Sequence, residues 1–375
     1  MTKNVALQKC YSYENEEVEK TIEYMMQLVP PPDVTNKTVL IKPNILSPKK
    51  VEAAVCTHPN IVAATVKCFL ARGAKNVIVG ESPAVTTSFV AAKATGMYDA
   101  VKKAGGKWVD FSLQTTVNVQ AGKLIKSIQF AKPFKDADIV VSISKLKTHQ
   151  LMAYTGAMKN LFGLVVGLRK AQMHYRFPDK KEFAKYITDL NIAANASYAI
   201  MDAIVSMEGP GGPGNGNPVN TNFLAASDNI LALDWICSKL VGYKPESILN
   251  LQDALERNIW LNDSNDIKIL GESFESIRPK NFKIVQETQL AITLRRIIPN
   301  WLDNLAQIIF VRNVHFNNSK CIRCGKCIEI CPAQILSFKE TNKSKYKKQI
   351  TIDKKNCLHC FCCHEICPVD AIKLR

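Results

Sequence analysis

The residues best suited to chemistry in this sequence are eight cysteines near its carboxyl end, arranged in two identical runs. Each run has the spacing C-x-x-C-x-x-C-x-x-x-C-P. In this spacing, three thiolates bind one iron–sulfur cluster and the fourth binds the other cluster. The spacing therefore predicts two 4Fe–4S clusters, one held by Cys321, Cys324, Cys327 and Cys367 and the other by Cys357, Cys360, Cys363 and Cys331.

The other five of the thirteen cysteines are scattered, at Cys10, Cys56, Cys68, Cys237 and Cys362. Cys362 lies within the second run, where we interpret it as a spare residue that does not bind the cluster. This usage is typical of a reducing compartment rather than of a disulfide framework. The first residues show no apolar signal segment, and no apolar run has the roughly 18 residues that a membrane span needs. We therefore expect a cytoplasmic protein without a transmembrane segment.

A second group of reactive residues follows the predicted strands of the long amino-terminal part. Lysine offers a point charge to phosphate or carboxylate, so several lysines at neighbouring strand ends predict an anion site, although each one alone is typical of a solvated surface. Histidine titrates near neutral pH and could move protons there. We assign His149 and Lys147 as catalytic candidates. The substrate-binding candidates are Lys42, Asn44, Lys145, Lys159, Asn160, Glu208 and Gly209.

Alternatives remain open for the neighbouring residues. His58, His149 and His174 could be metal ligands or hydrogen-bonded structural residues, and Cys56 could be a redox thiol or a small core residue. The glycine-rich loop from Gly209 to Gly216 could approach a ligand with its amides or form a rigid surface loop. It matches neither a dinucleotide-binding fingerprint nor a phosphate-binding P-loop.

The elements that must position these residues alternate between strand and helix. Strands are predicted at residues 3–9, 38–42, 76–80, 107–111, 124–130, 137–143, 199–205, 266–270 and 282–286. Helices are predicted at 14–28, 57–72, 88–104, 181–196 and 228–241. This order is typical of an α/β fold with a mostly parallel sheet flanked by helices, and ligands bind beyond the carboxyl ends of such strands.

The chain divides into three predicted parts: an α/β domain at 1–287, a helical connector at 288–315 and a small α+β, ferredoxin-like double-cluster domain at 316–375. The connector has amphipathic character, which favours packing against either domain, with a membrane-surface anchor as the alternative. From residue 316 onward, twelve Lys and Arg stand against five Asp and Glu, in a chain of net charge +16. The excess suggests an acidic partner or an anionic substrate, although a solvated basic surface is the simpler interpretation.

Several short motifs together resemble the domain of unknown function 362 family: Ile41-Lys42-Pro43-Asn44, Cys56-Thr57-His58-Pro59, Gly80-Glu81-Ser82-Pro83, Lys145-Leu146-Lys147-Thr148-His149, residues 155–163, residues 207–210 and residues 225–234. The resemblance covers about residues 35–245, and the tail looks like a bacterial-type double-cluster ferredoxin. It implies an iron–sulfur protein of a kind often found in anaerobes, but it supplies no reaction.

The favoured hypothesis is an oxidoreductase that moves electrons from the two clusters to an anionic substrate or cofactor in the α/β domain. A redox partner protein would supply the electrons. The alternatives are a non-catalytic electron carrier or adaptor and a metallocofactor assembly factor using His58, His149 and Cys56. We do not expect nucleic-acid binding, because no aromatic-rich recognition motif accompanies the positive charge.

Overall fold

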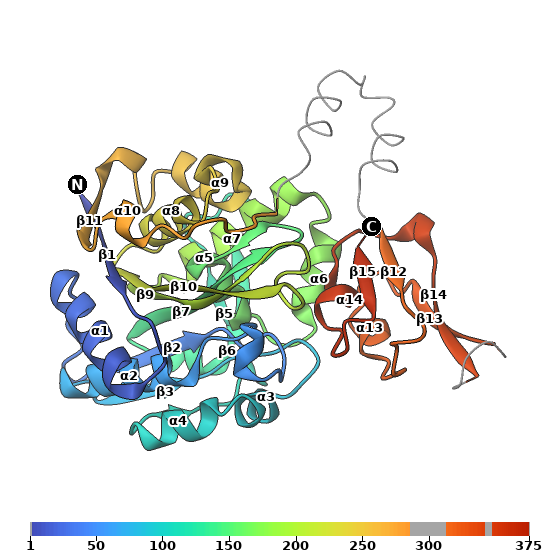
Figure 1. Cartoon of the computed structure of the whole chain (residues 1–375), viewed down its shortest axis with the longest axis horizontal. Helices are drawn as coiled ribbons and strands as arrows, with labels where there is room; N and C mark the ends of the chain where they lie inside the picture. Colours follow the sequence, from blue (N-terminus) through green and yellow to red (C-terminus); the bar gives the residue numbers. More distant parts are fainter. Residues whose placement is uncertain (1, 286–312, 342–346, 375) are drawn as a thin grey trace.

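A mostly parallel sheet organises the larger part of the chain (Figure 1). The computed structural model describes residues 2–285, 313–341 and 347–374. Within these ranges the sheet has nine strands in the order β11-β1-β10-β9-β7-β2-β3-β4, with β8 paired to β7. Only β8 and β10 run antiparallel to their described neighbours. The strands are β1 (Lys3–Lys9), β2 (Thr38–Pro43), β3 (Asn76–Val79), β4 (Lys107–Trp108), β7 (Ile139–His149), β8 (Ala153–Thr155), β9 (Tyr198–Glu208), β10 (Asn217–Ser227) and β11 (Ile267–Gly271).

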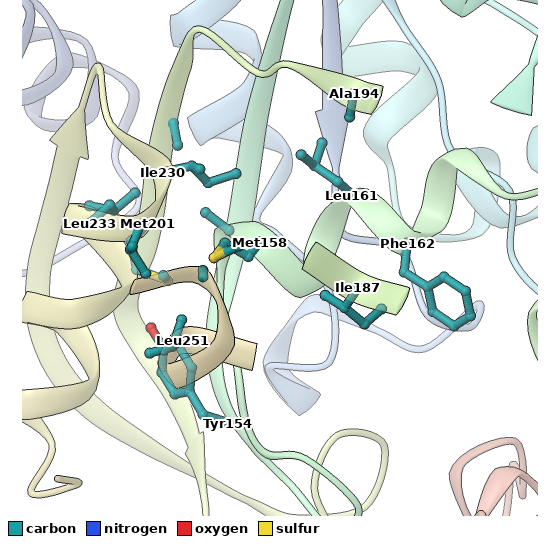
Figure 2. Close-up of a cluster of buried hydrophobic side chains, with 14 of the residues drawn as sticks. Tyr154, Met158, Leu161, Phe162, Ile187, Ala194, Met201, Ile230, Leu233 and Leu251 are labelled. Carbon is teal, nitrogen blue, oxygen red and sulfur yellow. The ribbon is translucent and has the colours of Figure 1, made fainter. Parts of the chain in front are cut away.

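Helices cover both faces of this sheet, each over its own apolar core. One face packs against α1 (Asn15–Leu28), α2 (Pro59–Ala71), α3 (Ser88–Ala94) and α4 (Met97–Lys103). The other packs against α5 (Ala157–Asn160), α7 (Lys180–Ala194), α8 (Ile230–Leu240) and α9 (Leu249–Glu256). Figure 2 shows part of the second core, where Met158 and Leu161 lie among side chains from α7, α8 and β9. Strand side chains alternate between the faces, so Val141 and Ile143 enter the first core and Val140 the second.

The predicted α/β class is confirmed, and the structure corrects several local predictions. The predicted helix at 88–104 is two helices, because Gly96 has a φ of 73° between them. The strand predicted at 124–130 forms β6 (Ser127–Ala131), which pairs with β5 (Gln114–Asn118) outside the main sheet. Residues 282–285 are not a strand. Strand β10 was not predicted, and it is the strand that reverses direction in the middle of the sheet.

The carboxyl-terminal residues form a small module with the predicted α+β character. The module has two short antiparallel strand pairs: β12 (Val314–Phe316) with β15 (Ile372–Leu374), and β13 (Leu336–Glu340) with β14 (Lys348–Ile352). It also has two one-turn helices, α13 (Lys326–Glu329) and α14 (Cys362–Glu365). Residues 288–312 of the predicted connector lie outside the described residues, and Val314 and His315 belong to β12.

The module packs on the α/β domain next to α6 (Arg169–Arg176), as Figure 1 shows. Ile330, Cys362 and Ile366 of the module form one buried cluster with Ala171 of α6, and Ala84 and Val85 pack against it. The Asn215 side chain donates a hydrogen bond of 3.0 Å to the His364 carbonyl. Of the helices that the structure describes, none is long and apolar enough to cross a membrane.

Candidate functional site

Adjacent parallel strands bring the predicted lysines to one edge of the sheet. β7 is hydrogen-bonded to β2 and β9 in parallel, so the carboxyl ends of all three strands meet there. Lys145, Lys147 and His149 occupy alternate positions of β7 and share one face. Lys42, Lys145 and Lys147 are each only 1% exposed. A buried ammonium group requires partners, because removing its charge from water is costly.

Lys42 has its partners within the α/β domain. Its ammonium group forms an ion pair with Glu81 and donates a hydrogen bond of 2.8 Å to the Asn160 side-chain oxygen. Burial lowers the pKa of Lys42, and the negative charge of Glu81 opposes that shift. Gly163 packs directly on this pair, and a side chain there would overlap both partners.

Lys145 also has an acidic partner. Its ammonium group lies 3.0 Å from Asp202 of β9 and donates a hydrogen bond of 2.8 Å to the Tyr13 hydroxyl, which in turn donates to Asp202. The Tyr13 ring stacks on His58 with centroids 3.8 Å apart. His58 begins α2, where its Nδ1 accepts a hydrogen bond from the Asn60 amide. The contacts of His58 are those of a helix cap and a stacking partner.

Lys147 differs from the first two lysines because both of its hydrogen-bond acceptors are neutral. Its ammonium group donates to the Asn44 side-chain oxygen at 2.8 Å and to the Val55 carbonyl at 2.6 Å. Burial lowers the pKa of Lys147 to about 7. Asn44 also donates to Asn160 at 3.2 Å, so one hydrogen-bonded network joins Lys147 to the Lys42 pair.

His149 contacts the carboxyl-terminal module. Its Nδ1 accepts hydrogen bonds from the amides of Leu151 and Met152, at 3.1 and 3.3 Å. The proton of the neutral ring therefore belongs on Nε2, which lies 3.5 Å from a Glu365 carboxylate oxygen. Burial, and then the charge of Lys159, hold the pKa of His149 well below its usual value, so the ring is neutral near pH 7.

Glu365 of α14 places a carboxylate among these groups. Burial raises the pKa of Glu365 to about 7, while the positive charges of Lys159 and Lys147 oppose that rise. Lys159 of α5 is half-buried, and its ammonium group lies 6.0 Å from the centre of the Phe162 ring. Burial lowers the pKa of Lys159, and the charge of Glu365 is the largest influence that raises it. We call Lys147, His149, Lys159 and Glu365 the seam site, because it lies where the two domains meet.

Other candidates have contacts elsewhere. Glu208 accepts a hydrogen bond of 2.8 Å from the Lys283 amide, and Gly209 donates one of 2.6 Å to the Lys283 carbonyl. His174 is stacked on Phe183 within an aromatic cluster. The glycine-rich loop approaches the module, and a side chain at Gly214 would come within 2.5 Å of the Glu365 carbonyl. The described residues contain no group of three or more His, Cys, Asp or Glu side chains placed to hold a single metal ion.

Several residues of this region were not among the predicted site residues. Glu81 follows the end of β3, next to predicted candidates, and that position was the available signal, whereas Asp202 lies within β9 opposite Lys145. Tyr13 and Glu365 come from distant parts of the chain, and no local pattern marks them. Lys170 of α6 was also missed: it donates to the carbonyls of Ser82 and Val165, and burial lowers its pKa to about 7.

The two cysteine runs have matching backbones. Arg323 and Gly325 of the first run have φ values of 60° and 78°, and the equivalent residues of the second run, His359 and Phe361, have values of 50° and 61°. This shared left-handed conformation turns both loops in the same way. None of the thirteen cysteines, all of which lie in the described residues, forms a disulfide.

The thiols gather in two mixed sets. A largely apolar cavity is lined by Cys357, Cys360 and Cys363 together with Cys331 from the other run, and Cys362, which lies outside the cluster spacing, also lines it. Burial, and then the charges of Cys321, Cys324 and Cys367, raise the pKa of Cys327 to about 11. Each set offers four sulfur donors, three from one run and one from the other, which is the donor chemistry that a 4Fe–4S cluster requires.

Comparison with known proteins agrees with both parts of the chain. The 4Fe–4S dicluster domain model matches residues 320–371, which supports an iron–sulfur electron-transfer role. The thylakoid-associated protein sll1697 of Synechocystis sp. is 28% identical over 270 residues, which cover 70% of this chain and 81% of that protein.

Two solved structures are more distant. The lactate racemase apoprotein from Thermoanaerobacterium thermosaccharolyticum has a TM-score of 0.40 and 15% identity, over 63% of this chain and 57% of that one. A protein from Thermotoga maritima has a TM-score of 0.35 and 11% identity, over 53% and 52%. The chain thus spans little more than half the length of either structure. The model described as "Domain of unknown function (DUF362)" matches residues 39–239, more than half of the sequence, and the chain belongs to this family.

Proposed function

We propose that the protein is an oxidoreductase that transfers electrons between two 4Fe–4S clusters and an anionic small molecule bound at the seam site. Cys321, Cys324, Cys327 and Cys367 would hold one cluster, and Cys357, Cys360, Cys363 and Cys331 the other. When bound, such clusters accept and donate single electrons. A redox partner protein would exchange electrons with the module.

The observation that carries this proposal is the position of Glu365. This residue lies in the chain between Cys363 and Cys367, which we assign to different clusters, and its carboxylate lies 3.5 Å from the His149 ring. A single helical turn, α14, therefore joins the cysteine module to the predicted catalytic histidine. Electron transfer falls off steeply with distance, so this contact supports the seam site as the place where electrons reach the α/β domain.

The residues of the seam site have distinct proposed roles. Lys147 and Lys159 would hold the negative charge of the small molecule, and the influence of both positive charges on the Glu365 carboxylate supports this role. The neutral His149 ring would donate a hydrogen bond to the bound molecule through its Nε2 proton, and so stabilise the negative charge that develops as that molecule gains an electron. His149 is only 2% exposed, so water would compete little for that proton.

The other predicted substrate-binding residues would act by positioning. Lys42 and Lys145 are each paired with an internal carboxylate. Asn44 and Asn160 connect Lys42 to Lys147 through hydrogen bonds. In this proposal these residues fix the Lys147 ammonium group in place, and they do not contact the bound molecule.

A single-turnover experiment tests this proposal. The clusters of the full chain would be reduced anaerobically and then mixed with the anionic small-molecule fraction of a host extract. We expect the wild-type clusters to be reoxidised, as seen in their visible absorbance, and the Lys159→Met variant to react at least about tenfold more slowly, because one ammonium group is lost from the anion site.

Lys102→Met, which changes an exposed lysine of α4, is the matched control and should react like the wild type. Iron content and the spectrum of the oxidised clusters would show that each variant is intact. Equal reoxidation rates in Lys159→Met and the wild type would contradict the assigned role of the seam site.

A second candidate function is a non-catalytic electron carrier whose α/β domain docks a partner. The burial and internal pairing of Lys42 and Lys145 favour it, because Glu81 and Asp202 already neutralise these two lysines within the fold. Under this function, no small-molecule fraction would reoxidise the reduced clusters, whereas a protein fraction would. Either function suits a reducing compartment, and we propose the cytoplasm because none of the thirteen cysteines, all of which lie in the described residues, forms a disulfide.

A further inference from the structure

A surface groove of about 950 Å³ lies between the module and α6. Its wall from the α/β domain is Tyr175, whose side chain is 60% exposed. Its other walls come from the turn after the first cysteine run and from β14 and the residues that follow it, and they are formed by Ala333, Gln334, Ile335, Ser337, Thr351, Ile352, Asp353, Lys355, Asn356, Cys357 and Leu358.

This groove shares a wall with the thiol-lined cavity. Ala333, Ile335, Ile352, Cys357 and Leu358 line both the groove and the cavity that contains Cys331, Cys360 and Cys363. Cys357 therefore reaches the groove directly, and a single layer of residues separates the groove from the other thiols of the cavity. Because the rate of electron transfer falls off exponentially with distance, a protein seated in the groove would be well placed to exchange electrons with a cluster in the cavity.

The same cavity adjoins the α/β domain on its other side. Cys360 packs against the buried cluster of Cys362 and Ile366, which also contains Ala171 of α6. The cavity thus adjoins both the groove and the buried contact with α6. This arrangement suits a cluster that takes an electron at the surface and delivers it inward.

The charge around the groove selects the partner. Lys354 and Lys355 are exposed beside Cys357, and Arg176 is exposed next to Tyr175. The carboxylate of Asp353 in the groove wall is engaged in local hydrogen bonds: it accepts one from the Lys355 amide at 3.1 Å and one from the Asn356 side chain at 2.7 Å. An exposed aromatic residue within a basic rim is typical of a protein-docking surface for an acidic partner.

We propose that this groove is the docking surface for an acidic electron-carrier protein. The inference rests on the proposed function in one respect, namely that the chain exchanges electrons through its clusters. In each encounter, one electron leaves the reduced cofactor of the carrier, which is oxidised by one electron, and enters the oxidised cluster beside Cys357. The contact is transient, so the opposite charges act mainly on the rate of association.

Stopped-flow kinetics with reduced flavodoxin, an acidic one-electron donor, test this surface on the full chain with both clusters bound. We expect the double variant Lys354→Glu/Lys355→Glu to lower the second-order rate of cluster reduction by about tenfold or more at low ionic strength. The difference should shrink at high ionic strength, because salt screens exposed charges. The matched control is Lys102→Glu/Lys103→Glu in α4, which makes the same change in net charge and should stay within about twofold of the wild type.

A second pair of variants tests the aromatic contact. Tyr175→Ser should slow reduction at every ionic strength, whereas Tyr24→Ser, which changes an exposed tyrosine of α1, should not. Equal losses of rate in the two lysine pairs, or an unchanged rate in Lys354→Glu/Lys355→Glu, would overturn the proposed surface.

Reduction by a small chemical reductant separates this test from that of the proposed function. All four variants should react with dithionite at the wild-type rate, because their clusters are intact. If the groove variants are slow with flavodoxin but no anion reoxidises the reduced wild type, the docking surface stands and the oxidoreductase proposal fails. If reoxidation by an anion is normal and the groove variants react with flavodoxin like the wild type, the reverse holds.

Discussion

Replacing Cys367 by serine is expected to remove the cluster that the first cysteine run forms, although Cys367 belongs to the second run. Burial, and then the charges of Cys321, Cys324 and Cys367, raise the pKa of Cys327, whereas the cavity of the second run contains Cys331 in place of Cys367. The variant should retain about four of about eight iron atoms per chain. Iron analysis and electron paramagnetic resonance of the reduced protein would measure the loss.

Two further variants identify which cluster is lost. Cys324→Ser should remove the same resonance signal as Cys367→Ser, whereas Cys360→Ser should remove the other one. Cys237→Ser is the matched control, since this buried cysteine belongs to α8 in the core of the α/β domain and should leave both signals in place. If the signal lost in Cys367→Ser matches that lost in Cys360→Ser, the ligands are not exchanged between the runs.

Breaking the buried ion pair beneath the seam site is expected to have the largest effect on stability. Lys42→Met leaves the Glu81 carboxylate buried without its cation, and removing one partner of a buried pair costs about 3–5 kcal/mol. We expect the thermal midpoint to fall by roughly 10 °C, measured anaerobically on the cluster-loaded protein. The double variant Lys42→Met/Glu81→Gln should recover part of the loss, because no uncompensated charge remains.

Lys20→Met provides the matched control for this prediction. Lys20 also forms an ion pair, with Glu16, but its side chain is 75% exposed. Such exposed pairs contribute about 0–1 kcal/mol, so the control should change the midpoint little. Equal midpoints in Lys42→Met and Lys20→Met would show that the buried pair does not hold this part of the fold together.

The sheet was predicted where burial and sequence pattern coincide, and it was missed where they do not. The apolar runs of β2, β3 and β7 predicted buried parallel strands, and the structure confirms them. However, the strand predicted to end at Ile143 continues to His149. The charged residues after Ile143 predicted the end of the strand, but their ion pairs and hydrogen bonds allow the strand to continue inside the protein.

Strand β10 was missed for a related reason. Its first half contains Pro218 and three asparagines, which are typical of a loop, and its pairing with β9 is irregular between Asn220 and Phe223. Pairing on both sides, with β1 and β9, overrides these local preferences. No local pattern could have revealed those partners.

The candidate site shows the same limit. Strand-end position selected Lys42, Asn44 and Lys147, and a glycine-bounded segment selected Asn160; the structure joins all four in one hydrogen-bonded network. Glu81 and Asp202 neutralise Lys42 and Lys145, and this changes the predicted anion site. Of the four predicted lysines, Lys147 and Lys159 remain without a hydrogen-bonded acidic partner among the described residues. Glu365 could not be assigned from the sequence, because its role depends on how the module packs against the α/β domain.

An anaerobically determined crystal structure of protein purified from its own host tests the central claim most directly. The account predicts both clusters in the module and density for an anionic molecule within hydrogen-bonding distance of the Lys147 and Lys159 ammonium groups and near His149 Nε2. A structure in which Glu365 and water alone contact these groups, in protein that holds both clusters and is active in electron transfer, would contradict it.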